Sequence, residues 1–103
     1  MGAHKSLGEL RVEALRIAEE RNRTMVEFVG TDLDLSIAFL EMALDPSNSP
    51  EKRKRNCTNA RKGYDFISRF LPNLQMSSRL RMKWEERLRH LKSSLEALGE
   101  RFS

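Results

Sequence analysis

Apolar residues recur every three or four positions near the start of the chain, which is the spacing of one face of an α-helix. This first stripe consists of Leu7, Leu10, Ala14 and Ile17. Ser6 followed by Glu9 is a capping-box pattern, which is typical of a helix start. The stripe is interrupted at Asn22 and then resumes, so the segment is either one helix or a helix broken near Asn22. We predict one helix over residues 6–29.

Gly30 is the next predicted boundary, because glycine tolerates the left-handed conformation that often follows a helix. Thr31 is then placed to cap a second helix, and Asp32 in its first turn suits the helix dipole. Residues 33–44 are apolar on nearly every side. Such a pattern is typical of a helix buried on most faces, so we predict a central core helix over residues 31–44.

Two prolines among serine, asparagine and aspartate mark a loop at residues 45–50. Ser49 can cap the next helix, and Pro50 suits its first position. The apolar stripe that follows consists of Ala60, Tyr64, Ile67 and Leu71. Pro72 then stops the helix, so we predict a third helix over residues 50–71.

The last predicted helix covers residues 77–99, starting at Ser77 or Ser78 and ending near Gly99. Its apolar positions alternate in steps of three and four, close to the 3.5-residue seam of a coiled coil. They are Leu80, Trp84, Leu88, Leu91, Leu95 and Leu98. Because the seam is shorter than three heptads, it favours packing within a bundle over a free-standing coiled coil.

These four segments, with no strand-like alternation between them, predict an all-α fold. We expect a small antiparallel bundle of about four helices in a single domain over residues 6–103. Residues 1–5 are expected to be disordered or to be a remnant of protein expression. The expected core is Leu10, Leu15, Ile17, Leu33, Ile37, Leu40, Leu44, Ala60, Tyr64, Ile67, Trp84, Leu88, Leu91 and Leu95.

The composition narrows the class of protein. The chain has 103 residues, of which 39% are apolar and 33% charged, and this suits a small charge-rich helical domain. No stretch approaches the roughly 20 apolar residues that span a bilayer, and the start of the chain lacks the apolar region of a signal peptide. Cys57 is the only cysteine, which excludes an internal disulfide. We therefore expect a protein of the reducing cytoplasm without a membrane partner.

Residues that could carry catalysis are few. A zinc site needs three or four converging ligands, whereas the chain offers only Cys57, His4 and His90, without metal-binding spacing. Adjacent carboxylates at 19–20 and 85–86 diverge by about 100° on a helix. We expect no enzymatic activity, no metal and no cofactor. Cys57 itself is either a small buried hydrophobe or a thiol activated by the basic residues nearby.

Charge is divided unevenly along the chain. Residues 1–50 hold five Lys and Arg against nine Asp and Glu, whereas residues 51–103 hold 14 against six. The basic half either forms a surface for nucleic acid or another polyanion, or complements the acidic half within the fold. The candidate polyanion contacts are Lys52, Arg53, Lys54, Arg55, Arg61 and Lys62, and a second basic cluster covers residues 79–92.

The third segment resembles the second helix of a tetratricopeptide-type repeat. That repeat has a small residue, an aromatic residue four positions later, a small residue three further on and then a proline. Ala60, Tyr64, Ile67 and Pro72 stand at these intervals, with Ile67 replacing the usual small residue. The similarity covers residues 31–72. This part of the chain is also similar to small tetratricopeptide-like helical proteins of bacteria. It implies a helical hairpin and a role in protein–protein interaction.

The sequence thus predicts a non-enzymatic helical interaction or adaptor module with an unidentified protein partner, and a basic polyanion-binding protein as the alternative. The candidate interaction residues are Met25, Val26, Phe28 and Val29, which occupy more than one face of their helix. A homodimer could cover the face that the core leaves exposed. Alternatively, the last helix covers that face within a monomer.

Overall fold

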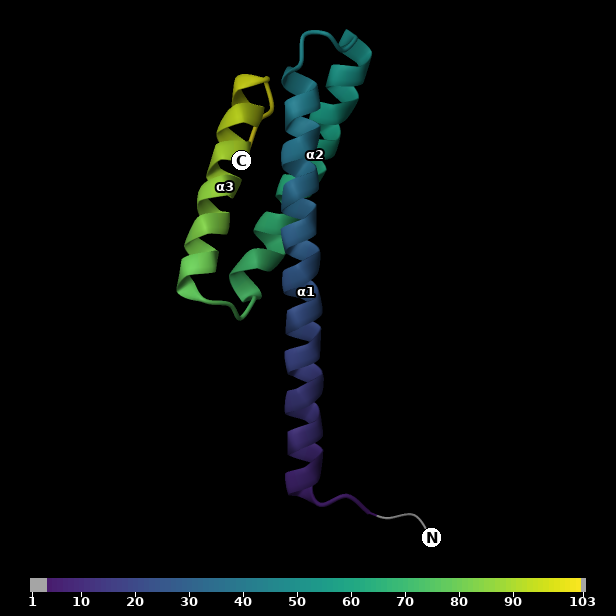
Figure 1. Ribbon diagram of the computed structural model, residues 1–103, viewed down its shortest axis with the longest axis vertical. Helices are drawn as coiled ribbons and strands as arrows, with labels where there is room; N and C mark the ends of the chain where they lie inside the picture. The colour runs from purple at the N-terminus through teal and green to yellow at the C-terminus, as the bar shows by residue number, and fades with distance from the viewer. Residues whose placement is uncertain (1–3, 103) are drawn as a thin grey trace.

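The computed structural model describes residues 4–102 and contains three α-helices (Figure 1). Helix α1 spans Leu7–Leu44, α2 spans Pro50–Phe70 and α3 spans Ser78–Ala97, and a 3-10 turn, η1, covers Leu71–Asn73. Within the described residues there is no strand. The all-α class is therefore confirmed, whereas the predicted count of four helices is corrected to three.

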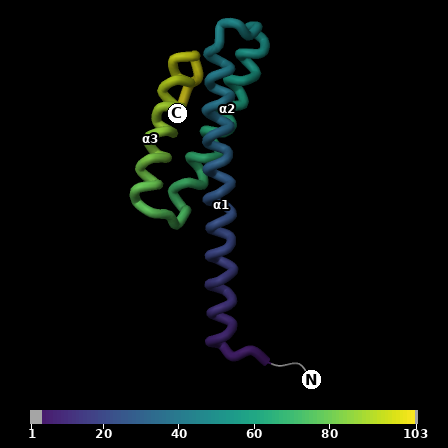
Figure 2. The backbone as a smooth tube through the Cα atoms, in the orientation of Figure 1, coloured from purple at the N-terminus to yellow at the C-terminus, as the bar shows by residue number. Residues whose placement is uncertain are grey.

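Helix α1 is much longer than its neighbours. Its 38 residues correspond to about 57 Å, whereas the 21 residues of α2 correspond to about 32 Å. Helix α2 returns antiparallel to α1 and α3 then runs antiparallel to α2, so both lie beside the C-terminal half of α1 (Figures 1 and 2). The N-terminal part of α1 extends past the α2–α3 connection. The molecule is consequently elongated, measuring 67 × 30 × 23 Å.

The predicted helix boundary at Gly30 is wrong, because α1 continues through Gly30 and Thr31 without interruption. It also continues through Asn22, which excludes the alternative of a break there. Gly30 lies against the indole ring of Trp84. A Cβ at this position would stand 2.9 Å from Cζ2 and 3.0 Å from Cη2 of the ring. The missing side chain therefore permits a close approach between α1 and α3 and does not end a helix.

The other predicted helix ends are confirmed by their capping hydrogen bonds. The hydroxyls of Ser6, Ser49 and Ser77 each accept a bond from the backbone N–H three residues later, at 3.1–3.2 Å. Gly99, with φ of 99°, follows α3, and the N–H groups of Gly99 and Glu100 donate to carbonyls in its last turn. This is a Schellman arrangement, which needs the left-handed conformation that glycine adopts easily.

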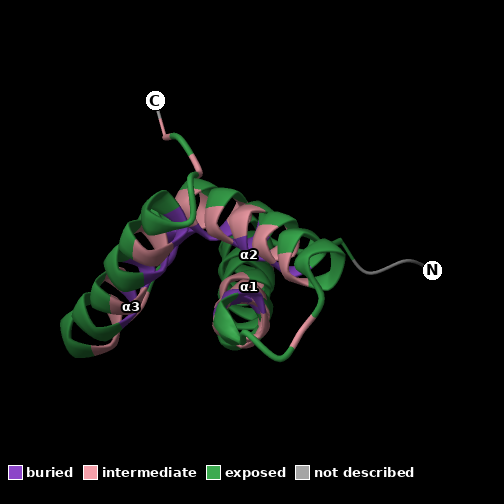
Figure 3. Ribbon diagram, turned by 90° about the horizontal axis from the view of Figure 1, so that it is seen from above, coloured by how far each residue is buried: buried purple, intermediate pink, exposed green. Residues whose placement is uncertain are grey.

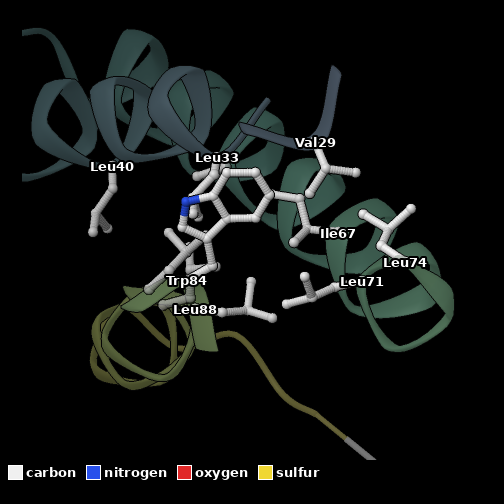
Figure 4. Close-up of a cluster of buried hydrophobic side chains, with 11 residues drawn as sticks. Val29, Leu33, Leu40, Ile67, Leu71, Leu74, Trp84 and Leu88 are labelled. Carbon is white, nitrogen blue, oxygen red and sulfur yellow. The ribbon is translucent and has the colours of Figure 1, made fainter. Parts of the chain in front are cut away.

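The core lies where the three helices meet, as the buried residues in Figure 3 show. The indole of Trp84 sits among side chains from all three helices and from η1 (Figure 4). The buried apolar residues are Val29, Leu33, Leu40, Ala43, Ala60, Ile67, Leu71, Leu74, Trp84, Leu88, Leu91 and Leu95. One contiguous cluster therefore joins the C-terminal half of α1 to α2 and α3.

Four residues of the predicted core are exposed to solvent. Leu10, Leu15 and Ile17 lie on the part of α1 that neither α2 nor α3 reaches, and Leu44 lies at the end of α1. Their exposed fractions range from 48% to 64%. Ile37 and Tyr64, also predicted to be core, are half-buried, and the other eight residues of the predicted core are buried.

Two buried polar side chains lie at the helix contacts and are satisfied locally. The Ser36 hydroxyl donates to the carbonyl of Asp32 at 2.7 Å, and the Asn56 amide donates to the carbonyl of Lys52 at 2.9 Å. Both bonds run back one turn along the same helix. Ser36 faces Gly63 on α2, where a Cβ would fall on the Ser36 hydroxyl. The two helices consequently pack closely at this point.

Candidate protein-interaction surface

Residues 7–21 of α1, which we call the arm, hold five of the ten large apolar side chains that are exposed in the described residues. The arm contains no buried residue, and Figure 1 shows it without a neighbouring helix. Its large apolar side chains have exposed fractions of 48–75%, and these are Leu7, Leu10, Val12, Leu15 and Ile17. Leu7, Leu10 and Ile17 lie within about 80° of one another around the helix, and exposed apolar surface that is contiguous in this way is typical of an interaction site.

The four predicted interaction residues do not form one surface. Val29 is completely buried and packs in the core, so of the four candidate residues it lies on the face that α1 turns toward the core. Met25 and Val26 are half-buried against the core. Phe28 alone is largely exposed, at 58%, and its ring makes an edge contact with Phe66 of α2 at a centroid distance of 5.4 Å.

A groove begins where the arm joins the core, on the side of α1 that carries Phe28. We call it the arm groove. It is lined by Ile17, Glu20, Arg21, Thr24, Met25, Phe28 and Phe66. Six of these residues come from α1 and one from α2, so the groove continues the apolar stripe of the arm as far as the edge of the helical hairpin.

A second groove lies on the other side of α1, between the arm and the α2–α3 connection. Leu15, Ala18 and Val26 line it from α1, while Met76 and Leu80 line it from the connection and from α3. Apolar surface therefore follows α1 on two sides at the base of the arm.

Asn22 explains the polar interruption in the apolar stripe of α1. Its side-chain amide donates to the carbonyl of Gln75 at 2.8 Å, and its carbonyl oxygen accepts from the backbone N–H of Gln75 at 2.8 Å. This reciprocal pair attaches the α2–α3 connection to α1. Asn22 thus marks the level at which the bundle ends and the arm begins.

Sequence reasoning missed the arm because an apolar stripe does not reveal what covers it. The stripe of the arm is continuous with the stripe that packs in the core, and both have helical spacing. Helix length was the available signal. A 38-residue helix beside helices of 21 and 20 residues must extend beyond them. That signal was concealed by the boundary predicted at Gly30.

The predicted polyanion contacts lie on α2 but have different surroundings. Lys52, Lys54, Arg55 and Lys62 are exposed, whereas Arg53 and Arg61 are half-buried. Between the acidic helix α1 and the basic helices, the described residues contain one ion pair, Arg87 with Asp34 at 2.8 Å. The basic charges of α2 are therefore not neutralised by direct pairing with α1.

Arg61 has a structural role at the C-terminal end of the chain. Its guanidinium donates to the Asp65 carboxylate at 3.0 Å and to the carbonyl of Arg101 at 2.6 Å. It also lies over the ring of Phe102, 3.7 Å from the centroid. The Phe102 ring makes a further edge contact with Tyr64 at 4.9 Å. These contacts hold the segment after α3 against α2.

Cys57 is half-buried, and burial raises the pKa of its thiol, with the nearby Glu100 carboxylate adding to the effect. A raised pKa lowers the fraction of reactive thiolate, which favours the interpretation of Cys57 as a small packing residue. His4 and His90 are both exposed and lie on separate parts of the chain. Over residues 4–102, no group of three or more potential metal ligands comes together.

The expectation that residues 1–5 are disordered falls partly on residues 1–3, which lie outside the described part of the chain. Lys5 is in contact with Glu13 through its ammonium group. No helix in the described residues combines the length and apolarity needed to cross a membrane. Comparison with protein-family models, with curated proteins and with solved structures finds no match to this chain.

Proposed function

We propose that the protein is a non-enzymatic helical interaction module of the cytoplasm that binds a helix of another protein chain, or of a second copy, along the arm. One observation carries this proposal. The arm is a helix of about 22 Å whose apolar side chains continue the core stripe but have nothing packed on them. An isolated helix of this length is marginal in water, so a bound helix would stabilise the arm as well as cover it.

The tetratricopeptide-like character of residues 31–72 remains part of the proposal. The antiparallel pairing of α1 with α2 and the close contact at Gly63 support it, since both are features of a tightly packed helical hairpin. The resemblance supports an interaction role and identifies no peptide-binding residues.

The interaction is tested by affinity capture from an extract of the cells that express the protein. We expect wild-type chain to retain a stoichiometric partner and Leu10→Glu to lose at least about 90% of it, since a buried carboxylate without a partner is costly. Arg16 is exposed and lies about 120° around the helix from Leu10, so Arg16→Glu serves as the matched control. Equal capture by Leu10→Glu and wild type contradicts the proposal.

The alternative function is binding of nucleic acid or another polyanion along the exposed basic residues of α2. The scarcity of ion pairs between α1 and the basic helices favours it, because those charges remain available to phosphates. If three or four phosphates are contacted, affinity for a labelled oligonucleotide should fall by about 40–150-fold between 50 and 200 mM salt. Binding should also weaken in Lys54→Glu and Lys62→Glu but not in Arg16→Glu. Binding that is feeble already at 50 mM salt contradicts this alternative.

A further inference from the structure

The accessible surface of the chain is larger than a compact monomer of its mass exposes. The chain has 7911 Å² of accessible surface, whereas a folded protein of 12.0 kDa is expected to have about 6,000 Å². Its radius of gyration is 19.0 Å against an expected value of about 13 Å. The excess surface, about 1,900 Å², falls in the range of roughly 1,000–2,500 Å² that each subunit buries in an obligate homodimer.

We infer that the partner of the arm is a second copy of this chain, with the two α1 helices antiparallel and each arm seated in the arm groove of the other. This inference rests on the proposed function and names its partner. In a two-fold dimer the same patch is used by both copies, so it must be complementary to itself. The arm and the arm groove meet that requirement in their exposed apolar residues and in their charge.

The apolar parts match when the two-fold axis passes α1 near residue 19. Leu10 of one copy then lies opposite Phe28 of the other. The two-fold rotation generates a second, equivalent pair on the other side of the axis. Both side chains are about half exposed in the single chain, Leu10 at 48% and Phe28 at 58%. Ile17, exposed at 49%, lies between them close to the axis. Apolar contacts therefore occur at both ends of an interface about 27 Å long, on either side of the charged residues near the axis.

The charged parts match as well. Glu20 and Arg21 both line the arm groove and are exposed, and within the described residues neither forms an ion pair. Near the axis, Arg21 of each copy reaches Glu20 of the other, which forms two equivalent ion pairs. A groove that carries one acid and one base can pair with its own copy, whereas a groove of a single sign repels it.

Light scattering coupled to gel filtration of the full chain tests the inference at concentrations from about 1 to 100 μM. The expected mass is twice the 12.0 kDa of the chain. Phe28→Glu and Ile17→Glu should each return the mass to that of the single chain while circular dichroism remains helical, because both side chains are already exposed in the monomer. Met82→Glu is the matched control, since Met82 is an apolar side chain exposed at 67% that lies on α3, outside the arm and the arm groove.

A charge exchange tests the antiparallel arrangement itself. Glu20→Arg and Arg21→Glu should each raise the dissociation constant of the dimer at least about tenfold, because like charges then face each other twice. The double variant Glu20→Arg with Arg21→Glu should restore the wild-type dissociation constant.

A single-chain mass at every concentration overturns the inference, as does a dimer that survives both Phe28→Glu and Ile17→Glu. The proposed function fails separately. If the chain is monomeric but still captures a different protein in a Leu10-dependent manner, the second-copy inference is wrong and the interaction module stands.

Discussion

Gly63→Ala is expected to lower the free energy of unfolding by about 2–3 kcal/mol, even though alanine favours a helix by about 1 kcal/mol over glycine. The added Cβ would overlap the Ser36 hydroxyl and stand 2.9 Å from the Ser36 Cβ. Rotation of the hydroxyl relieves only the first contact, so α1 and α2 must separate. Chemical denaturation followed by circular dichroism should show this loss, and the melting temperature should fall by about 10 °C.

A compensating substitution tests whether the overlap with Ser36 causes this loss of stability, or whether position 63 does not accept alanine for another reason. Ser36→Gly removes both close atoms and leaves the Ser36 Cα at 3.8 Å, an ordinary contact. The double variant Ser36→Gly with Gly63→Ala should therefore be more stable than Gly63→Ala alone. Gly8→Ala is the control, since a Cβ there meets only the Ser6 hydroxyl at 3.7 Å. The interpretation is wrong if Gly63→Ala is as stable as wild type.

The helix ends could be predicted from sequence because their signals are local. Ser49 and Ser77 form hydrogen bonds within three residues of themselves, and Gly99 adopts a left-handed conformation beside the carbonyls it satisfies. Each of these bonds depends on neighbours in the chain and not on the tertiary fold. The boundaries that were predicted correctly are all of this kind.

Gly30 could not be interpreted correctly in the same way, because its role depends on a residue 54 positions later. A glycine after an apolar stripe has the same local pattern whether it ends the helix or admits a neighbouring ring. The proximity of Trp84 to Gly30 exists only after α3 has packed on α1. Gly63 and Ser36 present the same difficulty, since each is an unremarkable small residue until the two helices meet.

The candidate surface was predicted only in part for a related reason. Periodicity identifies which side of α1 is apolar, and among the candidate residues it included Phe28, which is 58% exposed. It could not separate the part of the stripe that the bundle covers from the part that it leaves open. Val29 and Ile17 share the helical pattern, yet one is fully buried and the other is 49% exposed.

Trp84→Ala is expected to have the largest effect on stability, a loss of about 3–5 kcal/mol. The indole is buried and fills the space between α1 and α3 (Figure 4). Gly30 allows the two helices to approach at this point. A domain of this size has a total stability of only about 5–15 kcal/mol, so a milder variant is also needed. Trp84→Phe is that variant, and its free energy of unfolding should fall by less than half as much as that of Trp84→Ala. Trp84 is the only tryptophan in the chain, so circular dichroism and not fluorescence must follow unfolding.

Because Trp84 contacts Gly30, substitutions at the two positions should have coupled effects on the free energy of unfolding. A double-mutant cycle measures this coupling. In the wild-type background, Gly30→Ala should destabilise by about 1–2 kcal/mol, because the new Cβ meets the ring edge at 2.9 Å. In the Trp84→Ala background the ring is gone, and the same substitution should be neutral or stabilising by up to about 1 kcal/mol through helix propensity. The sign of the Gly30→Ala effect thus reverses only if Trp84 is what Gly30 accommodates. An equal loss in both backgrounds would show that glycine is required at position 30 for the backbone of α1 itself.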